Sequence, residues 1–168
     1  KLAQTMALIK GVGMGVVLNV FLGVPYLTVR EQIDDAMKAV EWAVTHSADR
    51  VVVFPSNIKP NTVIWDLYQQ KRYRRISHWA VVELLSRLDD ECLSRIELSW
   101  YGDRQKVGKS TEAIPPESCE DCDGAIFAFY QSFILCFDPQ QRRTLVRNIK
   151  KHAMCSCREK FCEELARS

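Results

Sequence analysis

Long hydrophobic runs are missing from this chain of 168 residues. No stretch of about eighteen apolar residues occurs, so the sequence predicts no transmembrane helix. Residues 1–10 also lack the charged region, apolar core and cleavage site that define a secretory signal. Internal repeats and low-complexity tracts are absent as well. These absences favour a cytoplasmic globular protein with no membrane partner.

Neither sign of charge dominates, because 23 basic side chains accompany 21 acidic ones and leave a formal net charge of +2. This balance excludes a strongly basic or acidic chain, whose charge alone would indicate its partner. The hydrophobic fraction of 47% is sufficient for a core, and the length suits about one domain. The chain starts at Lys1 with an uncapped helical stretch, residues 1–11. We expect either a start inside a domain or a cut at a convenient loop.

Residues 14–28 organise the first part of the chain. Their apolar, β-branched run is interrupted only by Asn19, and such a run bounded by glycines predicts a strand buried on both faces. A Gly-Val-Pro segment at 23–25 breaks the run, and Thr28 with Glu31 has the spacing of a helix capping box. The unit therefore predicts a strand, a tight loop and a helix. The loop would lie at the carboxyl end of a parallel strand, where α/β proteins bind ligands.

The strand and helix pattern continues to about residue 100. Further strands are predicted at 50–54 and 95–100, and helices lie between them. Three strands are too few to close a barrel. We therefore predict an α/β fold, with a partial (β/α) barrel fragment of about three parallel strands in residues 1–104. Residues 105–168 are predicted to form an α-helical, cysteine-rich tail.

Within the tail, residues 125–137 are apolar on nearly all sides and predict a buried helix. Residues 139–151 predict a basic helix. Upstream, the helix that Ser77 caps should bury an apolar face formed by Val81, Leu84, Leu85 and Leu88.

Two linked signatures in residues 1–100 resemble those of radical S-adenosylmethionine (SAM) enzymes. The segment NVFLGVP at 19–25, followed by Thr28 and Glu31, is similar to their fifth-strand motif. The segment IKPNT at 58–62, followed by a Leu-Tyr pair and Tyr73, is similar to their next strand, loop and helix. The likeness is to the branch that contains the elongator catalytic subunit, coproporphyrinogen dehydrogenase and the methylthiotransferases.

The resemblance implies a partial (β/α)6 barrel in which a cluster iron binds SAM and an electron cleaves it to a 5′-deoxyadenosyl radical. It implies that Asn19 hydrogen-bonds the SAM ribose and that Phe21 lies against the adenine. Gly23 and Pro25 would belong to the loop beside the adenine, and backbone atoms at Asn57 would read its edge. An amide can bridge hydroxyl groups and adenine suits a flat apolar wall, so this chemistry agrees with the residue types.

The cluster loop of that family, Cys-x3-Cys-x2-Cys, does not occur in this sequence. The strands that carry this loop would precede Lys1. The resemblance therefore implies the carboxyl-terminal half of a radical SAM protein, with the upstream half of the barrel as its partner. SAM and the 4Fe–4S cluster would belong to the full-length parent, and this segment alone is expected not to cleave SAM.

Seven cysteines, an odd number without a secretory signal, favour metal ligands or free thiols over disulfides. Cys119 and Cys122 form a CxxC pair, and Cys155 and Cys157 form a CxC pair. Four thiolates make a closed tetrahedral zinc site or hold an iron–sulfur cluster. Zinc is the preferred metal for a segment made alone in air. The alternative is a set of unligated or partly oxidised thiols.

The other cysteines and the three histidines are weaker candidates for metal ligands. Cys92 and Cys136 are predicted to be core thiols. Cys162 and His152 are further candidate ligands, although an exposed helix position is the simpler interpretation of His152. The other two histidines, His46 and His78, are predicted at the surface or at helix ends.

Basic side chains gather in the tail and in a short upstream segment, residues 71–75. Such a patch can meet RNA phosphates, and relatives that modify transfer RNA make RNA a reasonable substrate by analogy. A solvated helix face is the simpler interpretation, because no aromatic residues are interleaved for base stacking. The tail residues are Arg142, Arg143, Arg147, Lys150, Lys151, Arg158 and Lys160.

Two functional hypotheses follow. In the first, the chain is the second half of a radical SAM enzyme with a structural metal in its tail. In the second, it is a standalone metal-binding interaction module for RNA or another partner. Glu97 and residues 100–104 would lie where a barrel holds substrate groups, although Asp103 and Arg104 are also explained by a surface ion pair. In either case an open sheet edge predicts dimerisation or strand pairing.

Overall fold

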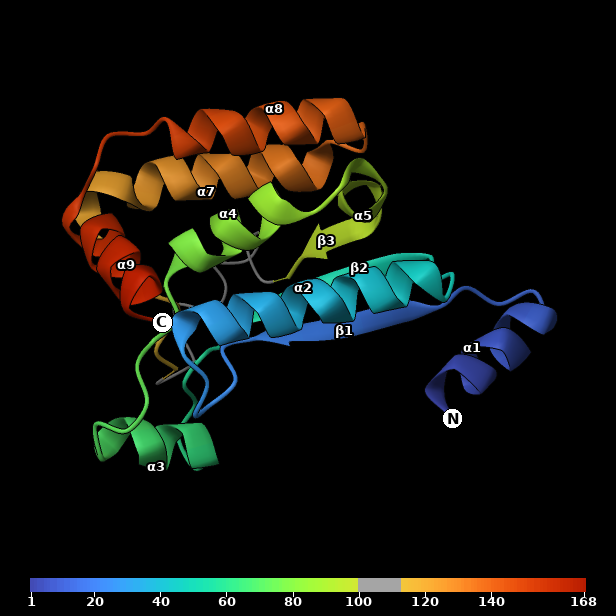
Figure 1. Ribbon diagram of the computed structural model, residues 1–168, viewed down its shortest axis with the longest axis horizontal. Coiled ribbons are helices and arrows are strands. Elements are labelled where there is room, and N and C mark those ends of the chain that lie inside the picture. Colours follow the sequence, from blue (N-terminus) through green and yellow to red (C-terminus); the bar gives the residue numbers. More distant parts are fainter. Residues whose placement is uncertain (100–112) are drawn as a thin grey trace.

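The computed structural model describes residues 1–99 and 113–168, so the predicted substrate residues at 100–104 lie outside the described residues. Three strands and a series of helices follow one another along the chain (Figure 1). The strands are β1 (Val17–Leu22), β2 (Arg50–Pro55) and β3 (Ile96–Leu98). The described helices are α1 (Leu2–Gly11), α2 (Val29–Thr45), α3 (Val63–Gln69), α4 (His78–Arg87), α5 (Asp90–Arg95), α7 (Glu120–Leu135), α8 (Pro139–Lys150) and α9 (Ser156–Arg167).

The three strands form one parallel sheet in the order β1-β2-β3. Val20 is opposite Val53, and Val53 is opposite Leu98, so apolar side chains meet across the centre of the sheet. A mixed α/β fold with three parallel strands is therefore confirmed. Within the described residues, β1 and β3 each pair on one side only.

Helices α2, α4, α7 and α8 form layers on one face of the sheet, while α1 and α3 lie apart from them (Figure 1). Helix α2 packs on β1 and β2 and contacts α4, while α7 and α8 lie side by side farther out (Figure 1). Helix α8 contacts both α4 and α5. The buried cluster includes residues of the sheet, of α2 and α4, and of α7 and α9. One hydrophobic core therefore connects the strands to the cysteine-rich tail.

The opposite face of the sheet is open. Val20 and Leu22 of β1 are buried, whereas Val17 is 55% exposed and Phe21 is 43% exposed. The prediction of a strand buried on both faces is therefore wrong. Alternate side chains of a strand point to opposite faces, and no helix in the described ranges covers the face that carries Val17, Asn19 and Phe21.

Local sequence patterns correctly predicted the starts of α2 and α4. The predicted capping box at the start of α2 is confirmed: the Thr28 N–H donates to Glu31 over 2.8 Å, and the Glu31 N–H donates to the Thr28 hydroxyl over 3.3 Å. Hydrogen bonds from Thr28 lower the pKa of the exposed Glu31 carboxyl. Ser77 caps α4, and the predicted core face of that helix is buried. None of the described helices has both the length and the apolar content needed to cross a membrane.

The composition of residues 125–137 predicted a helix that is buried on nearly all sides. Helix α7 is instead buried on only part of its surface. Ile126, Phe129 and Phe133 are buried, but Leu135 is 79% exposed and Phe137, beyond the end of the helix, is 71% exposed. The helix packs against α8 and β3, and this contact covers only part of its surface. Cys136, predicted in the core, is half-buried at the carboxyl-terminal cap of α7.

Arg142 of α8 does not lie on a solvated or RNA-binding face. Its side chain is 1% exposed, and its guanidinium donates to the backbone carbonyls of Cys136, Leu93 and Ile96. The guanidinium carbon also lies 4.6 Å from the centre of the Phe133 ring. Arg142 therefore joins α8 to the end of α7, to α5 and to the start of β3.

Gly23, directly after β1, has a backbone that requires glycine. Its φ angle is 114°, and a Cβ atom at this position would overlap the Ser56 hydroxyl oxygen and lie 3.0 Å from the Tyr73 hydroxyl oxygen. The Tyr73 hydroxyl donates to the Gly23 carbonyl over 2.7 Å and lies 2.5 Å from the Ser56 hydroxyl. This network fixes the ends of β1 and β2 to the segment after α3.

We expect Gly23→Ala to lower the free energy of unfolding by about 2–3 kcal/mol, because the methyl group meets both strain and steric overlap. The matched control is Gly124→Ala in α7, where nothing lies within 4 Å of the added Cβ. That change should stabilise the chain by roughly 0.5–1 kcal/mol through helix propensity. Urea unfolding measures both values. Equal effects of the two substitutions would contradict this account of Gly23.

Candidate metal centre

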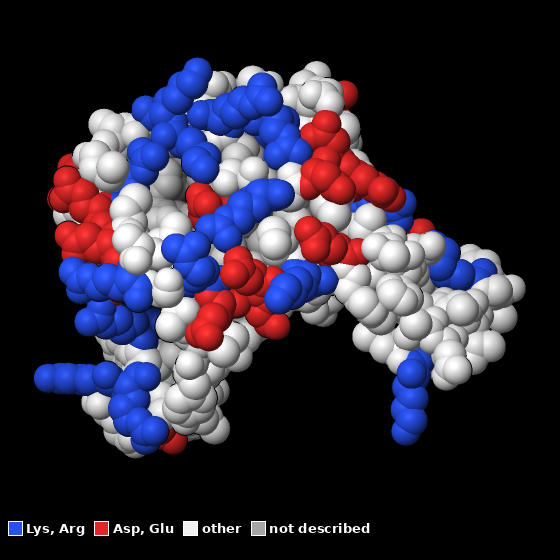
Figure 2. Space-filling model, in the orientation of Figure 1, with Lys and Arg blue, Asp and Glu red and all other residues white. Residues whose placement is uncertain are grey.

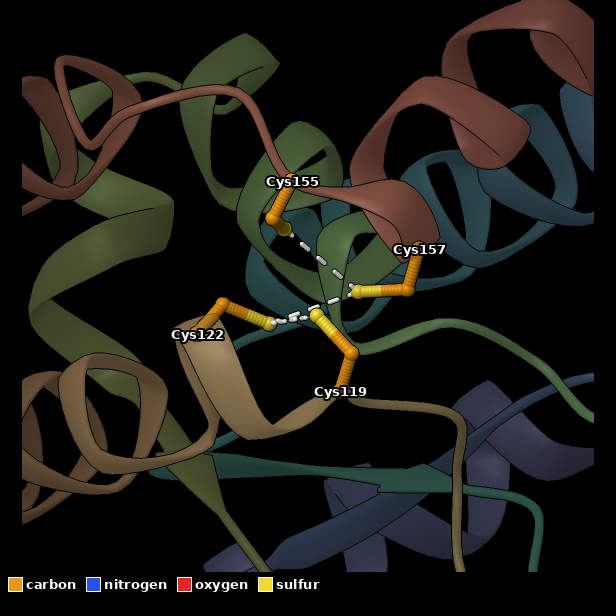
Figure 3. A group of neighbouring side chains, drawn as sticks. All are labelled: Cys119, Cys122, Cys155 and Cys157. Carbon is orange, nitrogen blue, oxygen red and sulfur yellow. Dashed lines mark hydrogen bonds between the residues drawn. The ribbon is translucent and has the colours of Figure 1, made fainter.

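Two helix N-termini meet at the predicted cysteine pairs. Cys119 is the N-cap of α7 and Cys122 lies in its first turn, while Cys155 is the N-cap of α9 and Cys157 lies in its first turn. Figure 3 shows the four side chains pointing toward one another from these two helix starts. A CxxC or CxC sequence at a helix start lets two thiols project to the same side, so each pair acts as one half of the site. These four residues are the tetracysteine centre below.

The tetracysteine centre has the dimensions of a single-ion site. All four Sγ atoms lie within 4.8 Å of one another. The Cys119–Cys122 and Cys155–Cys157 sulfur pairs are each separated by 3.7 Å, and the Cys122 and Cys157 sulfurs by 3.3 Å. A tetrahedral zinc with Zn–S bonds of about 2.3 Å sets its sulfurs roughly 3.8 Å apart. The centre can therefore bind a metal ion, and small movements would complete the tetrahedron.

The compactness of the tetracysteine centre favours one ion over a cluster. In a 4Fe–4S cluster each thiolate binds a different iron, so the four cysteine sulfurs lie farther apart than they do around a single ion. Soft thiolate ligands in a tetrahedral set are typical of zinc, or of one iron ion. Four protein ligands also leave no open coordination position, which is the pattern of a structural site.

The electrostatics of the tetracysteine centre differ among its thiols: a thiolate is favoured at Cys119 and opposed by burial at Cys122 and Cys157. The positive ends of the α7 and α9 dipoles both face the sulfurs, which stabilises thiolates. Although burial raises the pKa of Cys119, hydrogen bonds from the Cys157 amide and the neighbouring thiols outweigh it and lower that pKa to about 6. Burial raises the pKa of Cys122 and of Cys157. Metal binding at this centre would therefore displace protons from its buried thiols.

The other candidate ligands lie outside the tetracysteine centre. Cys162 is exposed on α9, and Cys92 is a buried core thiol, as predicted. His152 does not lie in a helix: it is half-buried in the turn after α8, where its Nε2 lies 3.3 Å from the Asp121 carbonyl oxygen. His78 begins α4 but is not at the surface, because its side chain is 1% exposed and its Nδ1 lies 3.3 Å from the Tyr130 hydroxyl.

The tetracysteine centre holds α9 against the rest of the molecule. Beyond the cysteines, Phe161 of α9 is buried in the core. The Arg158 guanidinium lies 4.5 Å from the centre of the Trp79 ring of α4 and donates to the Lys150 carbonyl over 2.7 Å. At the far end of α9, Arg30 of α2 donates to the Leu165 carbonyl over 2.9 Å. The centre and these contacts together fix both ends of the helix.

A separate hollow of about 310 Å³ lies on the open face of the sheet. It brings together three residues that the SAM resemblance singled out, Asn19 and Phe21 of β1 and Asn57 of the loop after β2. Gly23 and Pro25 do not line it. Its full lining is Asn19, Phe21, Phe54, Pro55, Asn57 and Lys59.

Other charged residues named from the sequence serve mainly as ion pairs. Glu97 of β3 accepts from Arg50 over 2.6 Å on the open face. In the tail, Arg143 pairs with Asp90 over 2.8 Å and Lys160 with Glu117 over 2.7 Å. The structure instead reveals a second hollow that sequence reasoning missed, between the start of α2 and the end of α9. Its residues come from three distant segments, so no local pattern could have indicated it.

Comparison of the chain with protein-family models, curated proteins and solved structures gives no match.

Proposed function

We propose that this chain is the carboxyl-terminal part of a radical SAM iron–sulfur enzyme, braced by a structural zinc at the tetracysteine centre. The observation that carries the proposal is the hollow shared by Asn19, Phe21 and Asn57 on the open face of the sheet. In a (β/α) barrel the helices cover the outside of the strands and the other face lines the interior. The open face of this sheet would then be the interior wall of a partial barrel.

The residues of the open-face hollow fit the adenosine half of SAM. Asn19 and Asn57 carry amides that can hydrogen-bond ribose hydroxyls or the adenine edge, and Phe21 with Phe54 offers flat apolar surfaces. When bound to a 4Fe–4S cluster, SAM supplies a 5′-deoxyadenosyl radical. The sequence contains no Cys-x3-Cys-x2-Cys loop, so the upstream half of the barrel would hold the cluster. This chain alone would bind but not cleave SAM.

Zinc at the tetracysteine centre would serve stability rather than chemistry. Four thiolates close the coordination sphere, so no position is left for a substrate or a water molecule. The reduced thiols that such a site needs agree with a cytoplasmic location, which we include in the proposal. The edges of β1 and β3 that pair with no strand in the described residues would pair with the upstream half or with a second copy.

NMR titration with S-adenosylhomocysteine tests the SAM proposal, because this stable analogue keeps the adenosine group. We expect saturable shift changes at the amides of Asn19, Phe21 and Asn57, and an affinity at least tenfold weaker in Asn19→Leu. Asn19 is exposed, so the substitution should not affect folding. Asn148→Leu, at an exposed position of α8, is the matched control and should bind like the unaltered chain. Shift changes elsewhere, or none at millimolar ligand, would overturn the proposal.

The second candidate, a standalone metal-binding interaction module, is favoured by the closed tetracysteine centre, which needs no other cofactor to be complete. The two candidates differ in the titration above, since the module would bind its partner without any response to S-adenosylhomocysteine.

A further inference from the structure

The hollow between the start of α2 and the end of α9 has a volume of about 520 Å³ and is rich in positive charge. Its walls are Thr28 and Val29 at the start of α2, residues 71–77, and the last turns of α9. Glu164 contributes a carboxylate side chain to the lining. Five cationic side chains surround it: Lys71, Arg72, Arg74, Arg75 and Arg167.

The charge of this basic hollow is only partly neutralised by the described residues. Arg74 pairs with Glu164 and Arg167 with Glu163. Lys71 and Arg75, by contrast, have no acidic partner in residues 1–99 and 113–168. Figure 2 shows basic side chains gathered at this end of the molecule as well as along α8. Several of the α8 cations are already bound to carboxylates or carbonyls. Lys71 and Arg75 have no such acidic partner in the described residues, so the basic hollow has the greater excess of positive charge.

An exposed aromatic ring lies beside these cations. Tyr26, in the loop after β1, is 73% exposed and lines the basic hollow. The guanidinium carbon of Arg72 lies 6.0 Å from the centre of its ring. The Tyr26 backbone has a φ angle of 71°, in the left-handed region that tyrosine rarely adopts, so the fold keeps this residue in place at a conformational cost. Tyr73 lies within the basic segment but is buried, so the exposed ring comes instead from the distant loop after β1.

The cations and the aromatic ring of the basic hollow converge on one concave surface. The start of helix α2 forms part of its wall, but the capping box already places the Glu31 carboxylate at this helix start, so the attraction for anions comes from the cationic side chains. This combination matches the two parts of a nucleotide, since the cations suit the phosphate and the ring suits the base.

We propose that the basic hollow binds single-stranded nucleic acid. Lys71 and Arg75 contact phosphates, and a base stacks on Tyr26 in the space that Arg72 borders. A phosphopeptide would use the cations but has no base to stack on Tyr26. A membrane would need an exposed apolar surface around the cations, whereas these side chains surround a concave wall. The proposal stands independently of SAM binding, which uses other residues.

Fluorescence anisotropy with labelled ten-nucleotide RNA and DNA strands tests the proposal on the full chain. Lys71→Ala with Arg75→Ala should weaken binding at least tenfold and lower the dependence of log affinity on log salt by about 1–2, since two phosphate contacts are lost. Arg147→Ala with Lys151→Ala removes the same charge from exposed positions at the other basic surface. This control pair should change the affinity less than twofold.

Substitution of Tyr26 separates stacking from charge. Tyr26→Ala should weaken binding about tenfold with no change in salt dependence, and Tyr26→Phe should retain the affinity of the unaltered chain. Equal losses in the control pair would overturn the proposal, as would an unaffected Tyr26→Ala variant. Binding of a phosphopeptide or an anionic vesicle without binding of either oligonucleotide would also overturn it. Thermal melts of each variant separate lost binding from lost folding.

Discussion

Replacement of Cys122 and Cys157 together by serine should lower the melting temperature of the metal-loaded chain by about 10 °C. A metal present at a thousandfold excess over its dissociation constant contributes about 4 kcal/mol to stability. In a chain of this length that contribution corresponds to roughly 8–16 °C in melting temperature. Both side chains are buried in the tetracysteine centre, one from α7 and one from α9, so the double variant loses both halves of the site.

The controls separate metal loss from the effect of a buried serine. Cys162→Ser changes an exposed thiol outside the tetracysteine centre and should melt like the unaltered chain. Removal of metal from the unaltered chain by a chelator should bring its melting temperature close to that of the double variant. If the double variant and the chelated chain both have the melting temperature of the metal-loaded protein, the tetracysteine centre has no stabilising metal.

Replacement of Arg142 by methionine should lower the free energy of unfolding by roughly 3–5 kcal/mol, although the substitution is apolar and similar in length. The guanidinium donates to three buried carbonyls, and each carbonyl left without a donor costs about 1–3 kcal/mol. Burial lowers the pKa of Arg142, although arginine remains charged at any pH the protein tolerates. The stacking of the guanidinium on Phe133 would be lost as well.

Arg147→Met on the same helix is the matched control for Arg142→Met. Arg147 is exposed, so its replacement should change stability by no more than about 0.5 kcal/mol. Urea unfolding of both variants measures the difference. An Arg142→Met variant within about 1 kcal/mol of the unaltered chain would show that the buried guanidinium is not a structural link.

The sequence predicted the features that depend on short-range patterns. The capping box at Thr28 and Glu31, the core face of α4 and the parallel order of three strands were all within reach of local spacing and hydrophobicity. The two cysteine pairs could also be identified from the sequence as candidate metal ligands, because each pair lies within a single helix start. That the two pairs meet follows from the packing of α7 and α9, which the sequence could only suggest.

Features that depend on the arrangement of distant segments were predicted less well. The composition of the first strand predicted burial on both faces, yet one face is open, because burial depends on where the helices pack. Arg142 was predicted on a basic helix face, and only the approach of α5, β3 and the end of α7 gives it three carbonyls to bind. The basic hollow joins residues 26–32, 71–77 and 161–168, so its aromatic ring and its cations could not be associated from the sequence.

The basic hollow and the tetracysteine centre are linked through α9. The centre fixes the start of this helix, and the last turns of the helix form one wall of the basic hollow. The open-face hollow depends on β1, β2 and the loop after β2 instead. Metal removal should therefore disturb nucleic-acid binding before it disturbs the open-face hollow.

X-ray absorption spectroscopy of the chain loaded with zinc tests the central claim about the tetracysteine centre most directly. The account predicts about one zinc per chain, surrounded by four sulfur atoms at about 2.3 Å, with no nitrogen or oxygen ligand. Less than half an equivalent of bound zinc, or a coordination shell with fewer than four sulfurs, would contradict it.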